Sequence, residues 1–409
     1  MTFGAVLCIV LSIPFVYQIF YHALTLRSCS RPVPAEVSDL YRPEVYRKWI
    51  DFRKESSRYH LLCSCAGTAI LFLVAGTEIL FPVVERLPRT RTALILASTV
   101  IHGLLSILSV PFRYYDEMVL KRKYGFCRKS VWAFLKERFL FILAYSFIGF
   151  IVSVFFCRCF LADTPGSEVM FQNRISFILP AAGILLLTLF QNLAEYIIRE
   201  ITEKKEDLCE DDLSEGLLEL SEELGFNGRI KVAESDTEDN LNAYYTPFGN
   251  KIVLYDTLIE GLTEDEICSV VAHEIGHAKH RDFGVSLISD ILLKLIGCFA
   301  FWVPGNYIVS HSITALRTMV PFRDACILIL IMVLYIPVAV MLTQYRTQRN
   351  ELAADRVAAE CGYGDDLITV LKKAARLDFE DLNPHPLLTA LYESHPPLIR
   401  RIENIREAE

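Results

Sequence analysis

Residues 263–309 read TEDEICSVVAHEIGHAKHRDFGVSLISDILLKLIGCFAFWVPGNYIV. The first half suits a water-facing helix, because Thr263 and Glu266 have the spacing of a capping box at a helix start. From residue 285 the stretch is long and apolar, and about 20 helical residues are enough to cross the hydrocarbon of a bilayer. The stretch therefore predicts a water-facing helix that leads directly into a membrane span.

Six other runs have the same character, and the whole chain is 53% hydrophobic with only 22% charged residues. The seven predicted spans are residues 3–24, 61–82, 92–112, 139–161, 175–197, 285–309 and 325–345. This predicts a mainly α membrane protein whose partner is the lipid bilayer. Nine of the acidic residues lie within 206–223, so the net charge of -8 belongs to one segment, and no nucleic-acid partner is expected.

Basic residues predict the orientation of these spans. The first and third loops are rich in Lys and Arg, whereas the second, fourth and sixth carry few. The positive-inside rule then places loops one, three and five and the C-terminus in the cytosol.

Two polar segments remain, residues 201–284 and 346–409, and together they can build one domain. The first contains short β-like runs at 229–234 and 251–255, with an extended segment at 242–245 between them. The predicted organisation is helices one to five in 1–200, the first part of this domain in 201–284, helices six and seven in 285–345 and the second part of the domain in 346–409. The soluble domain is expected to be small and α+β.

The water-facing helix contains HEIGH at residues 273–277. His273 and His277 lie one turn apart on one helical face, so both can bind one Zn²⁺ ion, and Glu274 can serve as general base for the attacking water. The alternative is a solvated helix with two His by chance.

A catalytic zinc needs a third protein ligand. His280 lies seven residues after His273, a rise of about 10 Å, which is too far for both to reach one ion. Glu351 is the better candidate, because it follows the seventh span and returns to the same membrane face. Asp355 shares its helical face and can orient a ligating His. Ordinary solvated helix charge is the alternative.

Near the C-terminus, His395 stands on a turn fixed by two prolines. It can donate to the oxyanion of a tetrahedral intermediate. The alternative is a capping region for the last helix.

HEIGH at 273–277, ELAAD at 351–355, NAY at 242–244 and SHPP at 394–397 together resemble the integral-membrane CAAX prenyl endopeptidases, or type I CAAX prenyl proteases. The resemblance implies seven helices around a large water-filled chamber and a zincin-type metalloprotease domain. It also implies peptide or protein substrates, prenylated or not, cleaved near the C-terminus of CAAX proteins. The membrane would be that of the endoplasmic reticulum in a eukaryote and the inner membrane in a bacterium.

The same resemblance assigns roles by position. The zinc ligands would be His273, His277 and Glu351, with Glu274 as general base and Asp355 behind the ligands. Substrate would lie along Asn242, Ala243 and Tyr244, and the transition state would be supported by His395 and Arg401.

Two other functions remain open from the sequence. A membrane quality-control metalloprotease would share the zinc residues but usually has fewer spans. A transporter or channel with a structural zinc is the other, because Asp290 and Lys294 are ionisable residues inside the sixth span. A mutual ion pair is the alternative explanation for these two.

Overall fold

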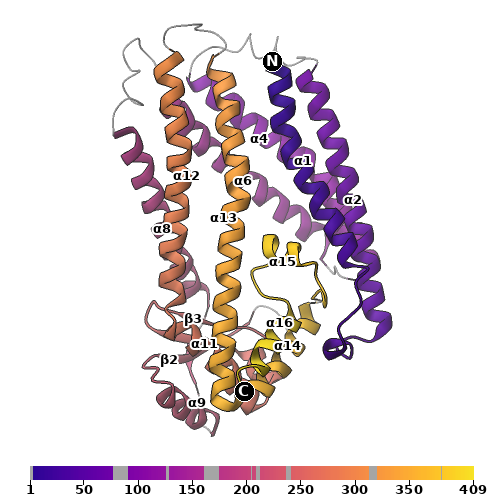
Figure 1. Ribbon diagram of the computed structural model, residues 1–409, viewed down its shortest axis with the longest axis vertical. Coiled ribbons are helices and arrows are strands. Elements are labelled where there is room, and N and C mark those ends of the chain that lie inside the picture. Colours follow the sequence, from indigo (N-terminus) through magenta and orange to yellow (C-terminus); the bar gives the residue numbers. More distant parts are fainter. Residues whose placement is uncertain are drawn as a thin grey trace. The chain divides into compact units, whose positions relative to one another are not determined.

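A computed structural model describes residues 3–76, 91–125, 129–160, 175–203, 205–208, 212–235, 241–312, 320–378 and 380–409. The described chain is mainly helical (Figure 1). It divides into two compact units, one of residues 1–29, 44–179 and 299–333 and the other of residues 30–43, 180–298 and 334–409. The four segments predicted from the sequence divide the chain differently and stay a prediction.

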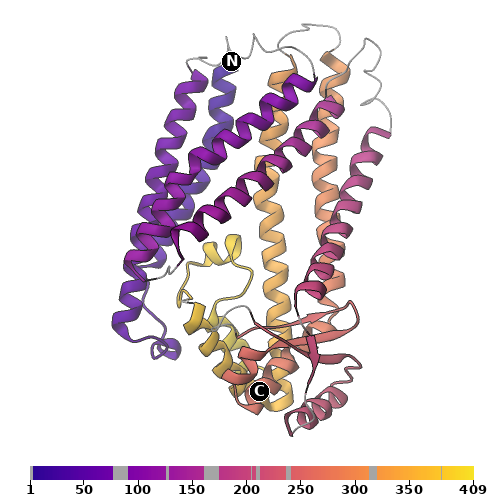
Figure 2. The ribbon, with the colours of Figure 1, turned by 180° about the vertical axis from the view of Figure 1, so that it is seen from behind.

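The first unit contains the first four long helices. These are α1 (Phe3–Ser28), α2 (Pro43–Gly76), α4 (Arg91–Tyr114) and α6 (Val131–Phe160), with the π-helix η2 (Tyr115–Leu120) and the short α5 (Lys121–Lys123) after α4. Helices α4 and α6 lie side by side (Figure 2). Helices α1 and α2 are joined where His22 Nδ1 lies 2.9 Å from Ser57 Oγ.

Three further long helices are α8 (Ile175–Thr202), α12 (Asp282–Ser312) and α13 (Val320–Ala358), and each of them is divided between the two units. The described part of each predicted span falls on one of these seven helices, whereas residues 77–82 of the second span and residue 161 of the fourth lie outside the described residues. Two segments of the described chain, Ile95–Lys123 and Asp282–Ala300, are long and apolar enough to cross a membrane by themselves. The number of crossings stays a prediction.

Asp290 and Lys294, the ionisable residues in the sixth predicted span, contact each other and a neighbouring helix. Lys294 Nζ lies 2.7 Å from Asp290 Oδ2 and donates to Thr188 Oγ1 of α8 at 3.2 Å. The Tyr335 hydroxyl of α13 donates to the Leu293 carbonyl of α12. These contacts favour the ion-pair explanation, and they hold the second unit's portions of α8, α12 and α13 together.

The second unit also contains a four-stranded sheet. Its strands are β1 (Lys205–Asp207), β2 (Arg229–Ala233), β3 (Ala243–Thr246) and β4 (Lys251–Tyr255), in the order β1-β2-β4-β3. Strand β2 is parallel to β4, and β3 is antiparallel to β4. The strands predicted at 229–234 and 251–255 are confirmed. Strand β3 lies at the edge of the sheet.

Helices provide the core of the second unit. They are α9 (Asp212–Glu223), α10 (Asp256–Gly261), α11 (Glu264–Lys279), α14 (Gly364–Asp378), α15 (Pro386–Tyr392) and α16 (Leu398–Arg406), with the π-helix η3 (Ala359–Tyr363) before α14. Helix α11 packs against β3 and β4 of the sheet. It begins with the predicted capping box of Thr263 and Glu266. Its apolar side chains Val271, Ala272 and Ile275 are fully buried, so this helix is the centre of the core.

Residues 30–43, which include the 3-10 helix η1 (Ala35–Val37), lie against α14. The Tyr41 hydroxyl donates to the Ala375 carbonyl, and Arg376 Nε donates to the Leu40 carbonyl at 2.9 Å. Because Val37 and Leu40 are buried as well, a segment far away in sequence stabilises α14.

Candidate metal centre

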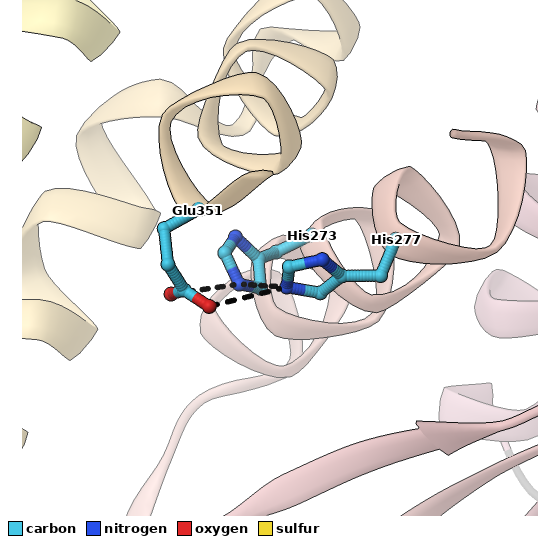
Figure 3. A group of neighbouring side chains, drawn as sticks. All are labelled: His273, His277 and Glu351. Atoms are coloured by element: carbon cyan, nitrogen blue, oxygen red, sulfur yellow. Dashed lines mark hydrogen bonds and ion pairs between the residues drawn. The ribbon is translucent and has the colours of Figure 1, made fainter. Parts of the chain in front are cut away.

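Two helices bring the predicted ligands together (Figure 3). His273 and His277 project from one face of α11, and Glu351 projects from α13. The two Nε2 atoms lie 3.2 Å apart, and the Glu351 carboxylate oxygens lie 3.8 Å from His273 Nε2 and 3.5 Å from His277 Nε2. All three potential ligand atoms lie within 4.8 Å of one another.

These distances fit a small divalent metal. Ligands at about 2.0–2.2 Å from a tetrahedral ion are about 3.3 Å from each other. Two imidazoles and one carboxylate are also the donor set of catalytic zinc sites that keep one position open. A cavity of about 760 Å³ adjoins all three side chains, which leaves room for substrate at the open position.

Both imidazoles are oriented by carboxylates behind them. His277 Nδ1 lies 2.7 Å from Asp282 Oδ2, and His273 Nδ1 lies 3.0 Å from Asp355 Oδ1. Asp282 reaches His277 because Arg281, between α11 and α12, adopts a left-handed φ of 54° and turns the chain. A carboxylate on the second ring nitrogen leaves Nε2 free for a metal.

We expect Asp282→Asn to weaken metal affinity by about 10- to 100-fold, because His277 loses the anion that fixes its ring and raises its basicity. Metal titration with a competing chelator measures the change. Asp265→Asn, an exposed carboxylate in the first turn of α11, is the matched control. Equal affinities in Asp282→Asn and wild type would exclude Asp282 from the metal centre.

Helices α11 and α13 approach closely at one point. A Cβ atom added to Gly276 would lie 2.8 Å from Ala354 Cα and 3.2 Å from its carbonyl oxygen. Ala354 is fully buried, so neither backbone can move without disturbing the core. The missing side chain at 276 is therefore what lets Glu351 reach the two His.

For this reason Gly276→Ala should lower the free energy of unfolding by roughly 1–3 kcal/mol and reduce metal occupancy. Thermal unfolding and metal analysis of the same sample test it. Gly284→Ala in α12 is the control, since a Cβ there meets nothing within 4 Å. Normal metal content and stability in Gly276→Ala would show that the contact has no influence on the site.

Glu351 lies among positive groups from the last part of the chain. His395 Nδ1 is 3.1 Å and Arg401 Nη1 is 3.5 Å from Glu351 Oε2. Burial alone would raise the pKa of Glu351, but the His395 hydrogen bond and the Arg401 charge lower it well below the ordinary value. The carboxylate is therefore ionised and ready to bind a cation. The same hydrogen bond raises the pKa of His395.

Arg401 also donates two hydrogen bonds to the Asp355 carboxylate, from Nε to Oδ2 at 2.8 Å and from Nη2 to Oδ1 at 2.6 Å. Asp355 is completely buried, and burial that would raise its pKa is outweighed by Arg401, so its pKa is lowered. Arg401 thus connects α16 to two carboxylates of α13.

Glu274 points toward the edge strand. Its Oε2 accepts a hydrogen bond from the Tyr245 N–H at 2.8 Å. On the other side of β3, the Tyr255 N–H donates to the Asn242 carbonyl. Backbone groups alternate along an antiparallel strand, so the N–H and carbonyl groups of Asn242 and Tyr244 face β4. Those of Ala243 and Tyr245 face away from the sheet. The outward edge of β3 therefore borders the metal centre.

The Tyr244 side chain is attached to the end of α8. Its hydroxyl donates to Glu203 Oε2 at 2.5 Å, and the Tyr255 hydroxyl donates to Glu203 Oε1 at 3.0 Å. The Arg199 guanidinium lies 4.8 Å from the centre of the Tyr244 ring. Tyr244 lines the cavity, and these contacts also position β3.

The structure brings nearly all the predicted site residues to one cavity. Its lining includes Asn242, Ala243, Tyr244, His273, Glu274, His277, Glu351, His395 and Arg401. Asp355 lies behind it. Sequence reasoning missed Asp282, Tyr245 and Glu380, and of these only Asp282 had a usable signal, five residues after His277 and just before a span. Burial raises the pKa of Glu380 to about 7.

Both parts of the chain match known protein families. Residues 207–409 match the model of peptidase family M48, and residues 22–171 match the model of the CAAX prenyl protease N-terminal region with five membrane helices. The chain is 28% identical to CAAX prenyl protease 1 homolog of Dictyostelium discoideum, over 74% of this chain and 70% of that one. It is also 28% identical to CAAX prenyl protease 1 of Saccharomyces cerevisiae, over 73% and 70%.

Among solved structures, the crystal structure of Ste24p from S. mikatae has the same fold. The TM-score is 0.71 with 99% of both chains covered, at 17% sequence identity.

Membrane helices and a His, His, Glu cluster beside a cavity define a membrane metalloendopeptidase. The chain belongs to peptidase family M48 and, within it, to the integral-membrane CAAX prenyl proteases.

Proposed function

We propose that this protein is a zinc endopeptidase that cleaves near the C-terminus of CAAX-type proteins, prenylated or not. The observation that carries the proposal is the His273, His277 and Glu351 cluster with Glu274 beside it at a large cavity. The names of the relatives, CAAX prenyl protease 1, support the substrate class.

His273, His277 and Glu351 would hold the ion. When bound, Zn²⁺ supplies Lewis acidity, which acidifies water and polarises a carbonyl. Glu274 takes the proton of the attacking water and later delivers it to the leaving amine. The Tyr245 N–H keeps the Glu274 carboxylate in place before substrate arrives.

The peptide would lie along the outward edge of β3. Ala243 offers its N–H and carbonyl there, and main-chain bonds of this kind hold an extended peptide whatever its side chains. Asn242 and Tyr244 border the same path, with Tyr244 fixed by Glu203. His395 and Arg401, which line the same cavity, would stabilise the oxyanion.

We expect His395→Ala to reduce kcat by about 100-fold with unchanged metal content, because one oxyanion donor is typically worth that much. Steady-state kinetics and metal analysis measure both quantities. His280→Ala, at the end of α11 and away from the cavity lining, is the control. An unchanged kcat would leave His395 with a structural role only.

The orientation follows from the basic loops, which place both metalloprotease parts in the cytosol. The membrane would be the endoplasmic reticulum in a eukaryotic cell or the inner membrane in a bacterium. Seven crossings around a water-filled chamber, with a zincin-type domain, complete the proposal.

Purified protein incubated with a farnesylated CAAX peptide and with its unprenylated twin tests the substrate class. Mass spectrometry of the products identifies the cleaved bond. Release of the last three residues from either peptide supports the proposal, and the ratio of the two rates gives the contribution of the prenyl chain. Cleavage only at internal sites of unrelated unfolded proteins would favour the quality-control alternative.

A further inference from the structure

A second hollow lies between α12 and α13, away from the metal centre. It has a volume of about 260 Å³ and is lined by Ser289, Leu292, Leu293, Ile296, Leu342 and Arg346. None of these residues lines the metal cavity. On α13, Arg346 precedes Glu351 by five residues, a rotation of about 140°, so the groove and the metal ligand lie on different faces of that helix.

The walls of this α12–α13 groove are apolar. Leu292, Ile296 and Leu342 are 53%, 56% and 46% exposed, so they present open hydrocarbon surface. The α12 side belongs to the apolar stretch Asp282–Ala300, which is long enough to cross a membrane. A chain of methylene groups is the natural filling for such a groove inside a bilayer.

One end of the groove carries a positive charge without an anion. Among the described residues Arg346 has neither an ion pair nor a hydrogen bond, and its Nε atom is buried without an acceptor. A buried donor without a partner is costly, so a ligand with a strong acceptor would be bound well here.

Arg346 lies at the depth where lipid headgroups are expected. It directly follows the predicted span 325–345, and it is about 7.5 Å along the helix from Glu351. Beside it, Tyr345 is exposed and carries the Arg349 guanidinium 5.9 Å from its ring centre, which is typical of a membrane interface. Leu342, Leu292 and Ile296 lie deeper in the apolar region.

We infer that the α12–α13 groove binds one anionic phospholipid, with an acyl chain between Leu292, Ile296 and Leu342 and the phosphate on Arg346. Because the groove faces away from Glu351, it suits a lipid of the bilayer better than the lipid chain of a substrate at the metal. With the proposed orientation this lipid comes from the cytosolic leaflet, where anionic lipids are enriched. It would bridge the two helices that carry Asp282 and Glu351.

Native mass spectrometry of the delipidated full-length protein tests this inference. The probes are phosphatidylserine and phosphatidylcholine with identical oleoyl chains. Wild type should bind one phosphatidylserine about tenfold more tightly than phosphatidylcholine. Arg346→Gln should lose that preference, and Arg349→Gln, three residues away on α13, should keep it.

A second variant tests the apolar part. Leu342→Trp should fill the groove and weaken both lipids to a similar extent, and unchanged zinc content in all variants shows that the fold is intact. Equal phosphatidylserine binding by wild type and Arg346→Gln would overturn the inference. Displacement of the lipid by inorganic phosphate would also overturn it, because the groove would then be a site for free anions. Displacement by a farnesylated peptide would overturn it as well, because the groove would then bind substrate.

Discussion

Glu274→Gln is expected to bind zinc as wild type does. It should cleave peptide about 100- to 10,000-fold more slowly, which is the usual contribution of a general base. Gln has nearly the same size as Glu, and its side-chain oxygen can still accept the Tyr245 N–H, so the local structure should remain. What the amide lacks is the ability to take a proton from water. The expected result is therefore a protein that binds zinc but does not cleave peptide.

Peptide cleavage followed by mass spectrometry, beside metal analysis, measures both properties. Glu264→Gln, an exposed carboxylate in the first turn of the same helix, is the matched control and should be fully active. If Glu274→Gln cleaved at the wild-type rate, the proton would have to be moved by another group.

Glu351→Ala should lose both metal and activity. Even carboxylates behind a metal ligand are worth 10- to 100-fold in affinity, so removal of a direct ligand should cost more than about 100-fold. It also leaves His395 without its acceptor and removes one of the anions beside the buried Arg401. Thermal unfolding of the metal-free protein separates this electrostatic effect from loss of the ion.

Glu360→Ala, nine residues later and exposed, is the control for this substitution. Stoichiometric zinc in Glu351→Ala, at an affinity close to wild type, would remove Glu351 from the ligand set.

Much of this site could be predicted from the sequence because its signals are local. The four-residue spacing in HEIGH places two imidazoles on one face of any α-helix, and the capping box fixes where that helix begins. The short runs of β-branched residues predicted β2 and β4 for the same reason. Glu351 needed one more step, the return of the chain to the same membrane face.

The rest depends on distant contacts that no local pattern contains. Gly276 looks like any helical glycine until Ala354, from another helix, lies against it. Tyr245 acts through its backbone N–H, so its side chain gives no hint that it holds Glu274. The support of α14 by Tyr41 likewise joins residues more than 300 positions apart.

The central claim is that one zinc ion at His273, His277 and Glu351 drives hydrolysis with Glu274 as base. The most direct test measures zinc content and peptide cleavage in the same preparations of wild type, Glu274→Gln and Glu351→Ala. The account predicts zinc with cleavage in wild type, zinc without cleavage in Glu274→Gln, and neither in Glu351→Ala. Zinc-free wild type that still cleaves, or Glu351→Ala with both zinc and cleavage, would contradict it.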